Sequence, residues 1–129
     1  LSAQNYIEEN FKEKITVDEL AERFNLGRRT FERRFKAATK NTIIEYIQRV
    51  KIEAAKVDLE KGRKTVSEIM YDVGYTDSKS FRDVFKKFAG MSPVDYKNKF
   101  NWFLVLLIMP FPEESLWDNP NLTLSFKSD

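Results

Sequence analysis

The feature that most constrains the fold is an internal repeat. The stretch Ile15–Tyr46, ITVDELAERFNLGRRTFERRFKAATKNTIIEY, is similar to the stretch Lys64–Tyr96, KTVSEIMYDVGYTDSKSFRDVFKKFAGMSPVDY. Matching residues lie 49 positions apart at first, as Thr16 and Thr65 do, and 50 apart after one inserted residue. Matches in this order indicate two copies of one supersecondary unit.

Each copy has the pattern of two helices joined by a short turn. Thr16 and Thr65 are each followed three residues later by glutamate. This is the capping-box pattern, in which the hydroxyl accepts from the glutamate amide and the glutamate side chain accepts from the threonine amide. A turn containing Gly27 or Gly74 then precedes a second helix, which Asp77 is placed to cap in the later copy. The order of elements is that of a helix-turn-helix.

The segments around the two copies also predict helices. Residues 43–61 contain no proline or glycine and carry apolar residues at helical spacing, and Gly62 is placed to end this helix. A helix of this length extends about 28 Å. A leading helix from Ser2 to about Lys12 and a short final helix from Ser92 complete a predicted all-α fold with seven helices and no sheet. We expect a bipartite helix-turn-helix domain at 1–101, with unit one at about 16–40, the connecting helix at about 43–61, unit two at about 65–90, and a tail of unknown role at 102–129.

Charge is unevenly distributed along the chain. The net charge is +2, yet residues 1–101 carry 21 lysines and arginines against 16 acids, whereas residues 102–129 carry 1 against 4. Residues 23–40 hold seven cations and one acid, and residues 79–87 hold four and one. Two local basic stretches on the second helices of the repeat suit a polyanionic partner.

The composition argues against catalysis. Cysteine and histidine are both absent, which excludes disulfides and thiol chemistry and removes the commonest general base and metal ligand. The acidic pairs Glu8-Glu9 and Glu113-Glu114 are adjacent in sequence, so their side chains would point apart on a helix, and no nucleophile accompanies them. We therefore expect no enzyme, no metal and no cofactor, and a reducing cytoplasm fits the lack of cysteine.

An ordered set of motifs covers residues 2 to about 100. It comprises Leu20-Ala21, Phe35-Lys36, Arg49-Val50-Lys51-Ile52, Ala55, Ile69, Val73-Gly74-Tyr75, Ser80-Phe81, Phe85-Lys86-Lys87, Gly90, Ser92-Pro93 and Tyr96. This set resembles the DNA-binding domain of AraC/XylS-type transcriptional regulators. The resemblance implies seven helices and promoter binding by two recognition helices in a bacterial, cytoplasmic protein that acts with RNA polymerase. It also implies a ligand-sensing or dimerisation domain outside this chain, which starts with Leu1 and reads as a fragment.

The resemblance also implies roles for individual residues. Carried over by position, the residues that read bases are Arg29, Glu32, Arg33, Ser78, Lys79, Arg82 and Asp83. Contacts to DNA phosphates are expected from Thr16, Arg28, Arg34, Lys36, Thr65, Lys86 and Lys87. The sequence departs from the family at two places. Ahead of the connecting helix the family often has Gly-Ser-Pro, where this chain has Asn41-Thr42-Ile43. Asp83 stands where a basic residue is common. An acid at this position repels phosphate unless it accepts from a cytosine amino group.

The length of the connecting helix fits a double-stranded target. Successive major grooves on one side of B-DNA lie about 34 Å apart, so two units joined by a helix of about 28 Å could enter adjacent grooves. The alternative is a helical protein-interaction module whose basic patches bind an acidic partner. That alternative explains the charge but not the duplicated helix-turn-helix. For the individual cations a solvated surface role also stays open.

The tail begins with an uncharged run, WFLVLLIMPF, at residues 102–111. This run is too short to cross a bilayer, which needs about 20 apolar residues. We expect it to pack on the helical domain, as an extension of the last helix or as a strand, or to pair with a second copy of the chain. A non-native or frameshifted tail is a further alternative.

Overall fold

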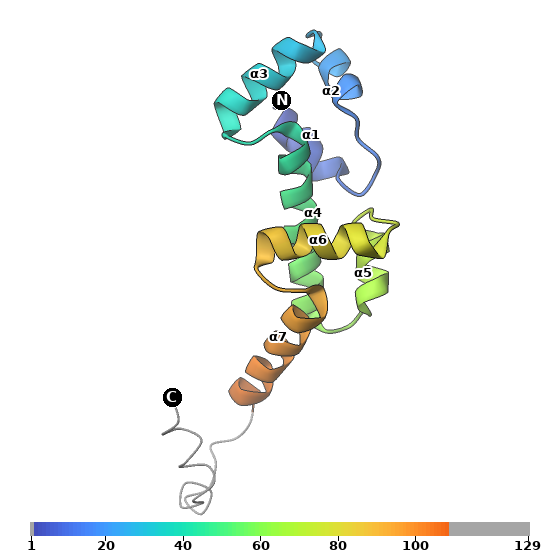
Figure 1. The fold of residues 1–129 in the computed structure, drawn as a ribbon, viewed down its shortest axis with the longest axis vertical. Coiled ribbons are helices and arrows are strands. Elements are labelled where there is room, and N and C mark those ends of the chain that lie inside the picture. Colours follow the sequence, from blue (N-terminus) through green and yellow to red (C-terminus); the bar gives the residue numbers. More distant parts are fainter. Residues whose placement is uncertain (1, 109–129) are drawn as a thin grey trace, which may run out of the picture.

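The computed structural model describes residues 2–108, and this part of the chain folds into seven α-helices without a strand (Figure 1). The helices are α1 (Ala3–Asn10), α2 (Val17–Arg23), α3 (Arg28–Thr39), α4 (Ile43–Lys61), α5 (Val66–Asp72), α6 (Ser78–Ala89) and α7 (Pro93–Ile108). The predicted all-α class with two helix-turn-helix units is confirmed. The bounds of the connecting helix, α4, agree with those expected from the sequence.

Side-chain caps hold the start of every helix except α3, where Gly27 supplies none. Asp77 accepts from the Ser80 amide at 2.9 Å, as predicted for α6. At α2 both halves of the capping box form, because Thr16 accepts from the Glu19 amide and the Glu19 carboxylate accepts from the Thr16 amide. At Thr65 the second half differs from the prediction, since the hydroxyl donates to the Glu68 side chain at 3.2 Å while accepting from its amide.

Two equivalent positions of the repeat adopt a left-handed backbone. Asn25 and Gly74, in the two turns, have φ of 55° and 97°, and Lys40 and Gly90, at the ends of the second helices, have φ of 65° and 79°. The predicted positive φ at Gly74 is confirmed. In the first unit asparagine and lysine occupy conformations that glycine adopts without steric cost, so this unit carries more backbone strain at its turns.

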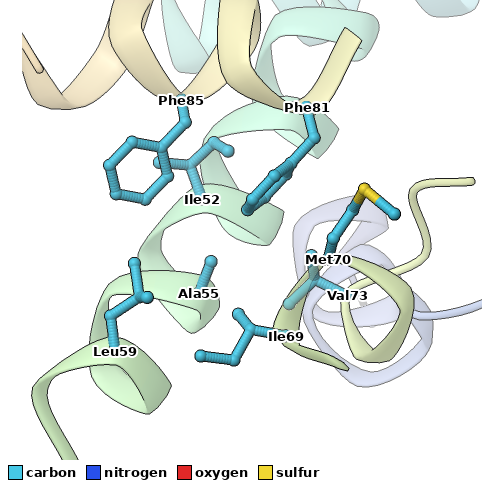
Figure 2. Close-up of a cluster of buried hydrophobic side chains, with 8 residues drawn as sticks. All are labelled: Ile52, Ala55, Leu59, Ile69, Met70, Val73, Phe81 and Phe85. Atoms are coloured by element: carbon cyan, nitrogen blue, oxygen red, sulfur yellow. The ribbon is translucent and has the colours of Figure 1, made fainter. Parts of the chain in front are cut away.

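Two hydrophobic cores are built on one shared helix. The first contains Ile7 of α1, Leu20 of α2, Phe31 and Phe35 of α3, and Ile43 at the start of α4. Figure 2 shows the second, in which the later turns of α4 meet α5 and α6 through Ile52, Ala55, Leu59, Ile69, Met70, Val73, Phe81 and Phe85. The two units therefore lie one after the other along α4 (Figure 1). Phe31, Phe35, Phe81 and Phe85 lie one helical turn apart on the second helix of each unit, and all four are buried, whereas Phe88 is partly buried.

A tyrosine closes each core in the same way. Tyr46 of α4 packs edge-on against Phe35 at 5.4 Å between ring centroids, and its hydroxyl donates to Glu8 of α1 at 2.8 Å. Tyr96 of α7 packs against Phe85 at 5.6 Å and donates to Glu60 of α4 at 2.5 Å. Burial, followed by these hydrogen bonds, raises the pKa of each tyrosine to about 12. Tyr96 of α7 therefore makes the same kinds of contact in the second unit that Tyr46 of α4 makes in the first.

The last helix is longer than predicted. Ser92 caps it by accepting from the Asp95 amide at 3.1 Å, but the helix then continues for 16 residues to Ile108, beyond the proposed domain boundary at residue 101. The expected extension of the last helix into the apolar run is thus seen as far as Ile108, and residues 109–111 lie outside the described part. Leu106 and Leu107 are exposed on this extension. Within residues 2–108, no helix is both long and apolar enough to cross a membrane.

Candidate nucleic-acid interface

The second helix of each unit buries aromatic side chains on one side and exposes charges on the other. On α3, Phe31 and Phe35 are at most 6% exposed, and on α6, Phe81 and Phe85 are at most 1% exposed. All seven predicted base-reading residues are exposed: Arg29, Glu32 and Arg33 on α3, and Ser78, Lys79, Arg82 and Asp83 on α6. Spacings of three and four residues keep the members of each group on neighbouring parts of the outer helix surface.

Arg28 is held by two acids in the free chain. Its guanidinium lies 3.3 Å from Asp18 of α2 and 3.3 Å from Glu32 one turn later on α3. The hydrogen bond with Glu32, and then the charge of Asp18, raise the pKa of Arg28. Because the pairs are exposed, they contribute little to stability, but they give Arg28 a structural role between α2 and α3. A phosphate contact from Arg28 would have to compete with both acids.

Lys79 and Asp83 form a pair on α6, the second helix of the second unit. The Lys79 ammonium lies 3.4 Å from an Asp83 carboxylate oxygen, one helical turn away. Both side chains are largely exposed, so bound DNA could separate them at small cost. The pairing gives Asp83 a partner in the free chain, and it reduces the positive charge that α6 presents relative to α3.

The other predicted phosphate-contacting cations lie on the same two helices, α3 and α6. Arg34, Lys36, Lys86 and Lys87 are all exposed, and the Lys87 ammonium lies 5.2 Å from the Phe88 ring centroid. Thr16 is half-buried and Thr65 is exposed, and each caps the first helix of its unit, as described above. Each threonine hydroxyl accepts from a backbone amide, and the Thr65 hydroxyl also donates to Glu68, so a phosphate at Thr65 would meet the helix N-terminus. A hydroxyl that accepts keeps its own O–H, which at Thr16 could donate to a phosphate.

A shallow depression adjoins the basic face of α3. Its volume is about 460 Å³, and its lining residues are Val17, Glu32, Arg33, Lys36, Thr42, Ile43 and Ile44. It contains one carboxylate and two cations but no paired acid and base. Over residues 2–108, no three metal-ligating acidic side chains come together. The depression is therefore best described as part of the basic surface that includes Arg33.

Sequence reasoning missed two sets of contacts here. Asp18, one of the two partners of Arg28, is ten residues away on another helix, and no local sequence pattern predicts this contact. The acids bound by Tyr46 and Tyr96 were also missed. For these a signal existed, because the two tyrosines occupy matching positions in the repeat and an equivalent acid could have been sought for each.

Comparison with known protein families matches residues 20–99 to a family described as a helix-turn-helix domain. The chain belongs to the AraC-type helix-turn-helix family. The resemblance stated from the motifs is thereby confirmed. The match begins within α2 and ends within α7, so it includes both recognition helices of this AraC-type domain.

Individual relatives agree with this family. An uncharacterized HTH-type transcriptional regulator of Pseudoalteromonas carrageenovora is 38% identical, covering 78% of this chain and 59% of that protein. The bifunctional transcriptional activator and DNA repair enzyme AdaA of Bacillus subtilis is 35% identical over 71% of this chain and 44% of that protein. The AraC-type chain thus spans about half the length of these two relatives.

A solved structure shares the fold. The DNA-binding domain of AdpA, a global transcriptional factor determined in complex with a target DNA, has a TM-score of 0.72 and 27% sequence identity. The similarity covers 75% of this chain and 87% of the AdpA chain. The arrangement of two helix-turn-helix units along α4 is therefore one that a related domain adopts on DNA.

Proposed function

We propose that this AraC-type domain binds double-stranded DNA sequence-specifically and regulates transcription, with α3 and α6 as its recognition helices. The observation that carries the proposal is the repeated placement of a basic, exposed helix face over a buried pair of phenylalanines. Phosphate neutralisation by such faces supplies affinity, and base contacts in the major groove supply specificity. Similarity to a domain solved with its target DNA supports the same reading.

The two units are proposed to enter adjacent major grooves. Both are built on α4, whose 19 residues extend about 28 Å. The groove repeat is about 34 Å, so two units of finite width on this helix suit neighbouring grooves on one side of the duplex. A single chain would then do what paired subunits do in many helix-turn-helix proteins.

Roles within the interface follow from position and charge. We assign base reading in the first unit to Arg29, Glu32 and Arg33, and in the second to Ser78, Lys79, Arg82 and Asp83. Thr16, Arg34, Lys36, Thr65, Lys86 and Lys87 are assigned to phosphates. Arg28 is assigned to phosphate only after release from Asp18 and Glu32. Arginine can bond guanine through O6 and N7, which favours Arg29 and Arg33 as the main readers.

The lengths of the relatives bear on what accompanies this domain. Because the chain covers about half of its curated relatives, we propose that a ligand-sensing or dimerisation domain accompanies the DNA-binding domain at 1–101. Cytoplasmic location, action with RNA polymerase and the absence of catalysis belong to the same proposal. Self-association through residues 102–111 is retained as a proposal for the tail.

Selection from a randomised duplex pool at two salt concentrations tests the function. An enriched motif with two blocks about one helical turn apart would support reading by both units. A single block would assign reading to α3 alone and leave backbone contact to α6. Binding without an enriched motif would leave only sequence-independent, electrostatic DNA binding. No binding at low salt would favour the protein-interaction alternative.

A further inference from the structure

The two units touch at a place other than α4. Phe11 directly follows α1, whose Ile7 lies in the first core, yet the Phe11 side chain packs against the second core. That core contains Ile52 of α4 and Val73 at the end of α5. The loop after α1 thus reaches across from one unit to the other, toward the turn between α5 and α6 (Figure 1).

Gly74 in that turn is in direct contact with the loop. A Cβ atom placed on Gly74 would lie 2.8 Å from the Lys12 carbonyl oxygen and 3.0 Å from the Lys51 ammonium. Its φ of 97° also disfavours any side chain. Backbone of the first unit therefore lies against backbone of the second with no room between them.

Lys51 and Tyr75 continue this contact toward the second recognition helix. The Lys51 ammonium lies 5.1 Å from the centroid of the Tyr75 ring, a cation–π geometry. Burial lowers the pKa of Lys51 and raises that of Tyr75 to about 12. The Tyr75 ring in turn lies 5.5 Å from that of Phe81, whose side chain is the first buried anchor of α6.

We propose that Phe11, Lys12, Lys51, Gly74 and Tyr75 form an interlock that fixes α6 relative to α3 and so sets the spacing between the two base blocks of a DNA site. One helix joining two small cores leaves bending and rotation about its axis as the softest motions. A second contact displaced from that axis opposes both. The members of the interlock act as positioning residues, and the proposal rests on the proposed function.

The interlock has a consequence for binding. When the first unit is bound, the second binds intramolecularly, at an effective concentration that depends on how well its orientation matches the next groove. A fixed orientation favours one spacing strongly and penalises others. Shifting the second block by two base pairs turns it by about 70° around the duplex axis, which a locked pair of units cannot follow.

The DNA test uses the selected two-block site, versions with two base pairs added or removed between blocks, and a version with the second block scrambled. In the unmodified chain, altered spacing should lower affinity by about tenfold or more, toward the scrambled duplex. Phe11→Ala should reduce that spacing penalty to less than about threefold, and Phe11→Leu should restore it. Phe24→Ala is the matched control, because this half-buried phenylalanine packs only within the first core.

Equal spacing penalties in Phe11→Ala and Phe24→Ala would overturn the interlock. If the unmodified chain does not distinguish the two-block from the scrambled duplex, the function assigned to the second unit fails, and a measurement without DNA decides the interlock. The chain has no cysteine, so Ala37→Cys with Lys87→Cys places one spin label on each recognition helix. A single narrow distance distribution that broadens with Phe11→Ala but not with Phe24→Ala supports the interlock. A broad distribution in the parent, or no change in either variant, overturns it.

Discussion

Adding one methyl group at Gly74 tests the closest approach of the two units. Alanine at a left-handed position costs about 1 kcal/mol relative to glycine once the extra entropy of glycine is counted. The added Cβ also meets the Lys12 carbonyl oxygen at 2.8 Å, and overpacking of this kind costs about 1–3 kcal/mol. Gly74→Ala should therefore lower the free energy of unfolding by about 2–4 kcal/mol. This loss is a large share of the free energy of unfolding of a typical domain, which is about 5–15 kcal/mol.

Gly90→Ala separates the two contributions. Gly90 has a φ of 79°, but a Cβ there would meet nothing within 4 Å. The free energy of unfolding should therefore fall by about 1 kcal/mol, from the backbone alone. Urea denaturation of both variants, followed by circular dichroism, gives the comparison. Equal losses in the two variants would show that the Lys12 carbonyl does not press on the turn, and the reasoning about the interlock would fail with it.

Four further outcomes are expected. Lys40→Gly should raise the free energy of unfolding by about 0.5–1 kcal/mol in urea denaturation, because Lys40 has a φ of 65°, and a loss would contradict this. Arg33→Ala should cost about 1–3 kcal/mol at one base position, whereas Lys86→Ala should weaken binding to all sequences alike, as titrations with matched and mutated duplexes would show. Asp83→Asn should tighten binding to non-specific DNA, because it removes an acid and releases a lysine paired at 3.4 Å; unchanged binding would count against this. The pKa of Asp77 is lowered by hydrogen bonds from a serine hydroxyl and amide, so its contribution to stability is present above about pH 4 and is lost as pH falls through its folded-state pKa. Asp77→Asn should lack this part of the acid dependence in urea titrations from about pH 5 to pH 2.

The local part of the fold could be predicted because short-range patterns determine it. The threonine caps, the helical spacing of apolar residues and Gly62 at the end of α4 each act within a turn or two of the chain. The internal repeat then supported each assignment twice. The same reasoning predicted which faces of α3 and α6 are exposed, since buried phenylalanines one turn apart orient a helix.

Contacts between distant segments could not be predicted in this way. Phe11 looks like the end of an amphipathic helix of the first unit, and only the folded chain shows that it packs in the second. For the uncharged run after residue 101, the sequence allows either a continuation of the last helix or a strand, and no local cap or glycine distinguishes the two; the structure continues α7 to Ile108. The base-reading roles on both recognition helices stay predictions, since exposure alone does not distinguish a reader from a solvated charge.

Both units pack on α4, so the number of α4 residues between the two cores sets the orientation of α6 relative to α3. Val50 packs on the first core and Ile52 on the second, so the transition falls within about one residue. One residue inserted there would leave the buried residues of each core on their own turns, but it would separate Phe11 and Lys12 from the second unit. It would turn one recognition helix by about 100° around α4 and move it by about 1.5 Å relative to the other. Insertions and deletions at this point could therefore give related domains a different operator geometry without a single change in either recognition helix.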